Sequence, residues 1–277
     1  MNKVTVVFCE GQHDIAFLSK ILMVHEYKAY DKKLNKFKEP FGKQFISILN
    51  DSNISDKKLG FHSEYQVPSV SLHKNKDELV LFHNMGGDDR KTERNNVLSM
   101  YKNLQGDEDD FTPNNFNYKF LYFFDADDKT IEDRVIKLNT ELALSSKIQH
   151  SHLTEIDTDT WGCYIFHKNA DGGYLEDILL ELMIPNNEQI FQNSKAFIEN
   201  TDIEETRQRE YICYKNEYRK NNKFKNNKSI ISIAGQLQFS SMNNAVIIAN
   251  SDYIKKDDIL SNIHYKNIIK LFEIKKS

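Results

Sequence analysis

Two short apolar runs that each end in acidic residues constrain the fold of this chain most strongly. The run 4–9 leads directly into Glu10, and the run 120–124 leads into the acidic cluster 125–128. Short apolar runs of this kind are typical of buried strands. In open α/β sheets, ligands bind beyond the carboxyl ends of the parallel strands. The two runs therefore predict carboxylates that meet at one edge of a parallel sheet, as in a Mg²⁺ site for phosphate chemistry.

Strand-type and helix-type patterns alternate through the first two thirds of the chain. This alternation predicts an α/β fold with a parallel, Rossmann-like sheet flanked by helices. The predicted strands are 3–9, 78–83, 119–124 and 160–166, and the helices among them are 12–25, 89–104 and 128–143. Helical patterns then dominate 174–183, 187–199, 203–220, 228–239 and 263–274. We therefore expect an α/β domain over residues 1–170 and a mainly helical extension over 171–277 packed on it.

Residues 28–77 form a long polar, lysine-rich insertion between the first helix and the next predicted strand. We expect it to be irregular or partly helical, with 45–49 as its best strand candidate. An elaboration that binds substrate is one interpretation of this segment.

Charge and cysteine content narrow the class of protein. Lys and Arg total 37 against 41 Asp and Glu, so no global basicity indicates a nucleic-acid binder, although acidic site residues can offset a basic groove. Three cysteines without a CxxC pair, Cys9, Cys163 and Cys213, predict reduced thiols instead of disulfides. No run approaches the ~18 apolar residues of a membrane span, and no signal-peptide pattern is present. We expect a cytoplasmic protein without membrane association.

Four carboxylates occupy positions suited to metal binding. Glu10 and Asp14 lie across a strand-to-helix turn, so both face one point if the helix starts near residue 12. Asp125 and Asp127 point the same way on extended backbone. Mg²⁺ prefers oxygen ligands and keeps several waters, and two ions about 3.5–4 Å apart can stabilise a phosphoryl displacement. The alternative for Asp14, Asp127 or Asp128 is a role only as a helix cap.

Further residues are candidates for the same site. Glu176, in the first turn of a predicted helix, is either an additional metal ligand or an acid that interacts favourably with the helix dipole. Lys228 begins a predicted buried helix, from which it would stabilise transition-state charge. Gly86 and Gly87 follow a predicted strand and give a weak phosphate-loop signal. For His13, a solvated turn position is favoured over phosphate contact or acid–base catalysis.

The segment 207–228 interleaves basic and aromatic side chains. Such a segment can contact phosphates and stack bases, but a solvated helix face is the favoured interpretation. The sequence contains no Walker A motif, which argues against a P-loop ATPase.

The order of these motifs resembles that of the TOPRIM domain, which type IA and type II topoisomerases, bacterial primases, small ribosomal-RNA maturation nucleases and overcoming-lysogeny-defect nucleases share. Members carry a glutamate after the first strand and a DxD motif after a later one, which together bind Mg²⁺. Glu10 matches the glutamate, and Asp125 and Asp127 match the DxD pair. The spacing of Glu10 and Asp14 resembles most closely the overcoming-lysogeny-defect branch, in which both acids are ligands. The resemblance covers about residues 3–170.

The resemblance implies Mg²⁺-dependent (or Mn²⁺-dependent) phosphodiester chemistry, with cleavage of DNA or RNA as the leading expectation. Glu10, Asp14, Asp125 and Asp127 would hold the metal, with Glu176 as an auxiliary ligand. A protein partner in a bacterial defence or repair system is what the nuclease relatives imply. Two alternatives remain open: a regulatory module that binds ATP or GTP without turnover, and a structural protein with a degenerate site.

Overall fold

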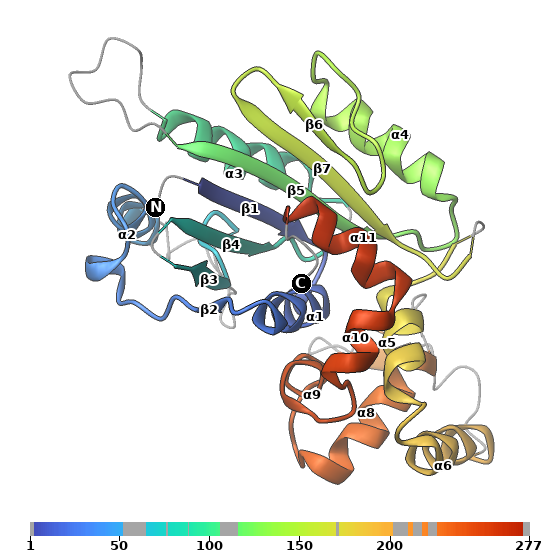
Figure 1. The fold of residues 1–277 in the computed structure, drawn as a ribbon. Coiled ribbons are helices and arrows are strands. Elements are labelled where there is room, and N and C mark those ends of the chain that lie inside the picture. Colours follow the sequence, from blue (N-terminus) through green and yellow to red (C-terminus); the bar gives the residue numbers. More distant parts are fainter. Residues whose placement is uncertain are drawn as a thin grey trace.

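The computed structural model describes residues 3–51, 65–75, 77–87, 89–105, 116–169, 172–201, 210–212, 218–220 and 226–273. Seven strands form one mixed sheet in the order β2-β3-β4-β1-β5-β7-β6 (Figure 1). They are β1 (Lys3–Cys9), β2 (Lys28–Ala29), β3 (Val70–Lys74), β4 (Glu78–Asn84), β5 (Asn117–Asp125), β6 (Leu153–Ile156) and β7 (Asp159–Phe166).

The four central strands, β4, β1, β5 and β7, run parallel, which confirms the α/β prediction. β1 lies in the middle, with Cys9 in register with Asn84 of β4 and with Phe123 of β5. Glu10, which follows β1, and Asp125, which ends β5, therefore reach the same edge of the sheet. The outer strands pair antiparallel, and the sequence patterns predict neither β2, β3 nor β6.

Helices follow most of the strands and continue through the C-terminal third. They are α1 (Gln12–Val24), the 3₁₀ helix η1 (Leu34–Lys36), α2 (Phe41–Asp51), α3 (Lys91–Asn103), α4 (Ile131–Leu142), α5 (Leu175–Met183), α6 (Glu188–Glu199), α8 (Asn226–Gln238), α9 (Asn244–Asn250), α10 (Lys256–Ser261) and α11 (Ile263–Leu271). The mainly helical character of the C-terminal part is thereby confirmed.

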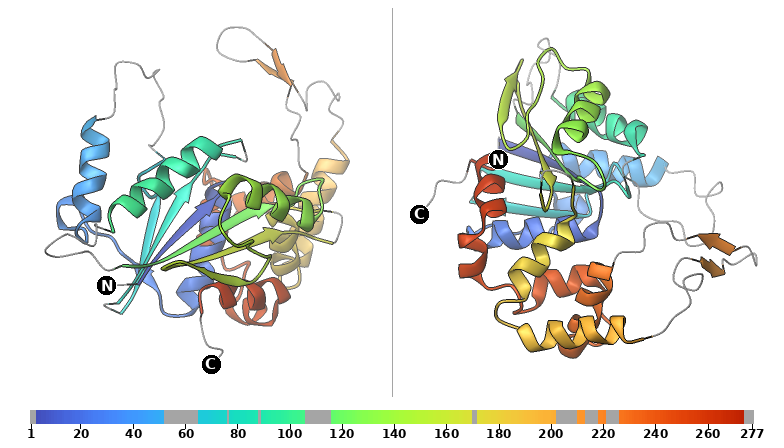
Figure 2. Two further views of the ribbon diagram at one scale, coloured as in Figure 1. Left: turned by 90° about the horizontal axis from the view of Figure 1, so that it is seen from above. Right: turned by 90° about the vertical axis from the view of Figure 1, so that its right-hand side faces the viewer.

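The sheet lies between two apolar layers, because alternate side chains of each strand point to opposite faces. Val6 and Phe8 of β1 pack in a core with residues of α2, α3 and α4. Val7 and Cys9 pack in a second core with residues of α1, α5, α8, α9 and α11. Figure 2 shows these C-terminal helices gathered on the α1 side of the sheet. The division into domains at residue 170 stays a prediction, and the second core contains residues from both sides of it.

Two local predictions are wrong. Residues 45–49 belong to helix α2, because Phe41 and Phe45 sit one turn apart and are buried together against the sheet. The prediction of a helix over 203–220 is wrong for the described residues of that range. Residues 210–212 and 218–220 are the paired strands β8 (Glu210–Ile212) and β9 (Tyr218–Lys220). The remainder of that helix, and residues 52–64 of the insertion, lie outside the described residues.

The described residues bear on two predictions, that the cysteines are reduced and that no segment spans a membrane. Cys9 and Cys163 are buried free thiols, and Cys213 lies outside the described residues. Within the described ranges, every helix is too short or too polar to cross a membrane.

Candidate functional site

The turn after β1 brings its two acids to the edge of the sheet. Gly11 precedes α1 in an extended conformation, and the helix starts at Gln12, as predicted. In the first turn of α1, Asp14 accepts a hydrogen bond of 2.9 Å from the Gly11 backbone N–H. Asp14 is therefore not the N-cap, which is Gly11, but the third helical residue, whose carboxylate accepts from the N-cap backbone. The residue is only 5% exposed. A cap alone does not require such burial.

The end of β5 lies beside Glu10. The backbone N–H of Asp125 donates to Glu10 Oε1 at 3.3 Å. Asp125 Oδ1 accepts a hydrogen bond of 2.8 Å from the backbone N–H of Leu175, the first residue of α5. Three segments that are distant in the sequence therefore meet at these two carboxylates.

Asp127 does not lie on extended backbone, so the prediction that it points the same way for that reason is wrong. β5 ends at Asp125, and Asp127 has a left-handed φ of 55°. Its backbone exchanges two hydrogen bonds of 3.0 Å with Gly173, which fix the turn. Neighbouring Asp128 is not the N-cap of α4, because Thr130 takes that position.

Arg134 is a site residue that the sequence analysis missed. Its Nη2 donates to Asp127 Oδ2 at 2.5 Å and lies 3.5 Å from Glu10 Oε1. Its Nε donates to the backbone carbonyl of Asp125 at 2.8 Å. The available signal was its position seven residues after Asp127, on the helix that follows the acidic strand end.

Glu176 joins the same group from the start of α5. His13 Nδ1 donates to Glu176 Oε1 at 2.9 Å, and Lys228 Nζ of α8 lies 3.4 Å from the same oxygen. Lys228 thus lies within reach of the site, as predicted. His13 lies in helix α1 and pairs with a buried carboxylate, so its interpretation as a solvated turn residue is wrong. We call Glu10, Asp14, Asp125, Asp127 and Glu176 the acid cluster.

Burial and mutual repulsion perturb two of these acids. Burial raises the pKa of Asp14 to about 8, and the charges of Glu10 and Glu176 add to the shift. Burial, followed by the charges of Asp14, Glu10 and Glu176, also raises the pKa of Asp125 well above its usual value. Strongly perturbed acids in a group of this kind mark a candidate functional site.

Glu176 behaves in the opposite way. Burial is the largest influence on its pKa and raises it, but the hydrogen bond from His13 and the charges of Lys228 and His13 outweigh burial and lower it. Glu176 therefore stays ionised and accepts the hydrogen bond from His13 Nδ1.

The glycine turn after β4 reaches the same edge. Gly86 and Gly87 have positive φ angles of 69° and 124°, and the Gly87 N–H donates to the backbone carbonyl of Glu10 at 3.1 Å. Glu10 thus contacts Gly87 and Asp125 directly, and Arg134 links Glu10 to Asp127. Lys228 contacts Glu176, whose neighbour Leu175 donates to Asp125. Most of the basic segment 207–228 lies outside the described residues.

The chemistry of the acid cluster fits a hard cation, although its present geometry is not closed around one. Within the described residues, no three His, Cys, Asp or Glu side chains are arranged to hold a metal ion as they stand. The donors are all carboxylate oxygens, and burial together with neighbouring acids raises the pKa of Asp14 and of Asp125, an effect that a bound cation would oppose. Mg²⁺ usually takes one or two carboxylates and keeps its waters, so a complete protein cage is not required.

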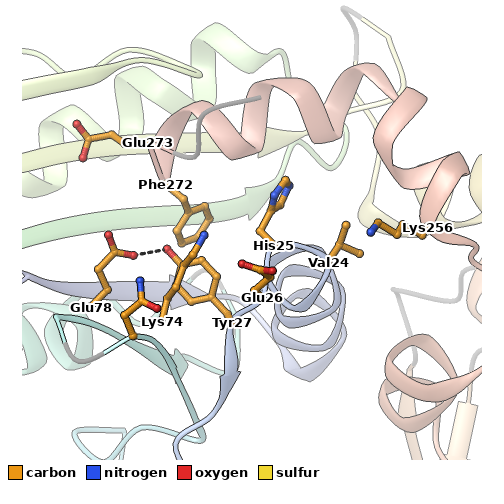
Figure 3. A pocket seen from close by; sticks show the side chains of 10 residues that line it. Val24, His25, Glu26, Tyr27, Lys74, Glu78, Lys256, Phe272 and Glu273 are labelled. Atoms are coloured by element: carbon orange, nitrogen blue, oxygen red, sulfur yellow. Dashed lines mark hydrogen bonds between the residues drawn. The ribbon is translucent and has the colours of Figure 1, made fainter. Parts of the chain in front are cut away.

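A cavity of about 560 Å³ lies elsewhere, near the amino ends of the strands (Figure 3). Its lining includes His25 beyond α1, Lys74 and Phe272, and the Tyr27 hydroxyl donates to Glu78 at 2.7 Å. Glu78 is the first residue of β4, whereas the acid cluster follows the opposite ends of β1 and β5. The cavity is therefore separate from the candidate site.

Comparison with known proteins identifies one family. The family described as "Protein of unknown function (DUF3226)" matches residues 4–258. No curated protein and no solved structure matches the sequence.

Proposed function

The chain belongs to the DUF3226 family, and we propose that it performs Mg²⁺-dependent phosphodiester chemistry, most directly the cleavage of nucleic acid, at the acid cluster. The observation that carries this proposal is the meeting of Glu10 and Asp125 at adjacent strand ends, with buried Asp14 beside them. The resemblance of their motifs to those of TOPRIM nucleases supports the same chemistry. A TOPRIM assignment, a DNA or RNA substrate and a defence or repair partner all belong to the proposal.

The acids and the basic residues around them have separate roles in this proposal. Glu10, Asp14 and Asp125 would supply the carboxylates for Mg²⁺ or Mn²⁺, which when bound polarises a phosphoryl oxygen and acidifies a bound water. Asp127 instead forms an ion pair with Arg134. Lys228 adds positive charge where negative charge develops during displacement.

His13 is the residue placed to handle a proton. Its Nδ1–H is held by ionised Glu176, so Nε2 is the ring nitrogen that would exchange a proton. A carboxylate that fixes the tautomer in this way orients an acid–base histidine. Glu176 thus acts through His13 as well as through its charge.

The test is cleavage of single- and double-stranded DNA and RNA by the full chain with Mg²⁺ or Mn²⁺. We expect cleavage by the wild type, none by Asp125→Asn, and near wild-type cleavage by Asp128→Asn. Asp128 is the matched control because it is exposed in the same acidic run and its carboxylate accepts from Tyr174 instead.

Unchanged cleavage in a folded Asp125→Asn protein would refute the proposal. Tight ATP or GTP binding without hydrolysis, lost in the same variant, would favour the regulatory alternative.

A further inference from the structure

The guanidinium of Arg134 occupies one side of the acid cluster. The residue is 4% exposed, and its Nη2 lies between Asp127 Oδ2, at 2.5 Å, and Glu10 Oε1, at 3.5 Å. Its Nε is fixed by the backbone carbonyl of Asp125 at 2.8 Å. A positive charge is therefore held between the acids that follow β1 and β5.

The start of α4 directs Arg134 to this place. Thr130 is the N-cap of the helix, and its Oγ1 accepts from the Asp133 backbone N–H at 3.1 Å. The first turn of α4 is exposed or half-buried, and Arg134 is its first buried residue. Arginine remains charged at any physiological pH, and its planar fork loses little freedom on binding carboxylates. Arg134 is thus a permanent part of the cluster's charge balance.

The positive charge is unevenly distributed over the acid cluster. Asp127 makes its close ion pair with Arg134, and Glu176 has His13 and Lys228. Asp14 and Asp125 instead accept hydrogen bonds from neutral backbone N–H groups, those of Gly11 and Leu175. The demand for an external cation is therefore greatest beside Asp14 and Asp125.

We propose that Arg134 serves as a resident cation in place of a second metal ion, so that the site takes up a single divalent ion beside Glu10, Asp14 and Asp125. This inference rests on the proposed function and specifies the stoichiometry of its metal. Two-metal phosphoryl-transfer sites hold their ions about 3.5–4 Å apart. A second ion close to Asp127 would be repelled by the guanidinium at short range. Arg134 is a positioning residue in this account, because it contacts the acids and not the substrate.

The test is a count of Mn²⁺ ions bound by the full chain, by calorimetry and by the electron paramagnetic resonance signal of bound Mn²⁺. We expect one Mn²⁺ in the wild type, with the signal of an isolated ion. Arg134→Gln should bind two, with a signal broadened by coupling between them. Arg134→Lys keeps the charge and is the matched control, with an expected count of one.

Asp127→Asn provides a second test that does not disturb the arginine. Because Arg134 holds Asp127, this variant should keep one Mn²⁺. Its affinity should stay within about threefold of wild type, a difference of about 0.7 kcal/mol or less in binding free energy. Asp125→Asn should lose the ion.

The outcomes separate this inference from the proposed function. Two Mn²⁺ ions in the wild type, or loss of binding in Asp127→Asn, would overturn the inference and leave the metal-dependent function standing. One ion in folded Arg134→Gln would also overturn it. Absence of Mn²⁺ binding by the wild type would overturn the metal-dependent function itself. If Arg134→Gln does not fold, the inference is tested by the number of Mn²⁺ ions that the wild type binds and by Mn²⁺ binding to Asp127→Asn.

Discussion

His13 Nδ1 donates a hydrogen bond of 2.9 Å to Glu176 Oε1, across 163 residues of sequence. The contact joins the start of α1 to the start of α5, and Lys228 of α8 approaches the same carboxylate. The helical C-terminal part therefore contributes side chains to the edge where β1 and β5 end. In our proposal, these side chains supply the proton-handling group and one positive charge.

Replacement of Glu176 by glutamine should lower both activity and stability. The amide no longer fixes His13 as an ionised carboxylate does, and removal of an acid–base contribution typically costs about 10²-fold or more in rate. Burial alone would raise the pKa of Glu176, but His13 and Lys228 lower it overall, so the ionised carboxylate stabilises the fold at neutral pH. Its loss should therefore lower the melting temperature. Cleavage kinetics and thermal unfolding of Glu176→Gln test both expectations.

Glu181→Gln is the control for this experiment, because Glu181 is exposed on the same helix. It should change neither quantity. A wild-type cleavage rate in Glu176→Gln would show that the His13–Glu176 pair has no role in the chemistry.

Asp125→Asn should stabilise the metal-free protein. Burial and three neighbouring acids raise the pKa of Asp125, so its charged form is costly in the fold at neutral pH. Asparagine keeps an oxygen for the Leu175 N–H and removes the charge. A gain of about 0.5–2 kcal/mol is typical when a strained functional residue is relieved, and each kcal/mol raises the melting temperature by roughly 2–4 °C in a chain of this size.

Calorimetry in chelator-treated buffer measures this gain, with Asp257→Asn as an exposed control on α10. A lower melting temperature in Asp125→Asn would mean that its carboxylate serves the fold and not a site.

Arg94 and Glu141 form a buried ion pair that should dominate the stability of the α3–α4 side. Arg94 donates from Nε and Nη2 to the two oxygens of Glu141, each at 2.7 Å, and the side chains are 1% and 6% exposed. Removal of one partner leaves an uncompensated buried charge, which typically costs about 3–5 kcal/mol. Glu141→Leu should therefore lower the free energy of unfolding by that amount in denaturant titrations.

The double variant Arg94→Met/Glu141→Leu should recover much of the loss, because an apolar pair carries no desolvation penalty. A single variant that costs less than about 1 kcal/mol, the value typical of exposed pairs, would contradict this assignment.

Buried His83 should make the fold sensitive to acid. Its Nδ1–H donates to the Tyr65 carbonyl at 2.7 Å, and Tyr101 OH donates to Nε2 at 2.7 Å. Burial lowers its pKa to about 4 from an ordinary value of 6.5, so the neutral ring is the folded form. Above pH 6.5, His83 is neutral in both states and costs no stability. As the pH falls from 6.5 towards 4, the unfolded state binds a proton that the folded state does not, so the free energy of unfolding falls. The full loss is on the order of 3 kcal/mol.

Unfolding titrations between pH 7 and about 4 should show a steeper loss of stability in the wild type than in His83→Gln. His152→Gln, at an exposed position, should follow the wild type. Parallel pH profiles for the wild type and His83→Gln would contradict the assigned role of His83.

The sequence patterns predict the centre of the fold well because the central strands are continuous apolar runs. The runs at β1 and β5 place Glu10 and Asp125, whose positions depend only on where each strand ends. Residues 45–49 mislead because their β-branched and aromatic content is typical of strands, whereas the burial of Phe41 and Phe45 on one helical face decides the structure.

The features of the site that the sequence patterns do not predict depend on tertiary contacts. The turn at Asp127 depends on a backbone pairing with Gly173, and the role of Arg134 depends on how α4 packs on β5. The contact of His13 with Glu176 links residues that no local pattern connects.

The most direct test of the central claim is calorimetric titration of Mg²⁺ and Mn²⁺ into the wild type and into a Glu10→Gln/Asp125→Asn double variant. We predict saturable binding by the wild type that is lost in the variant, because both carboxylates at the paired strand ends are gone. No binding by the wild type, or equal binding by the two proteins, would contradict a metal centre at this edge of the sheet.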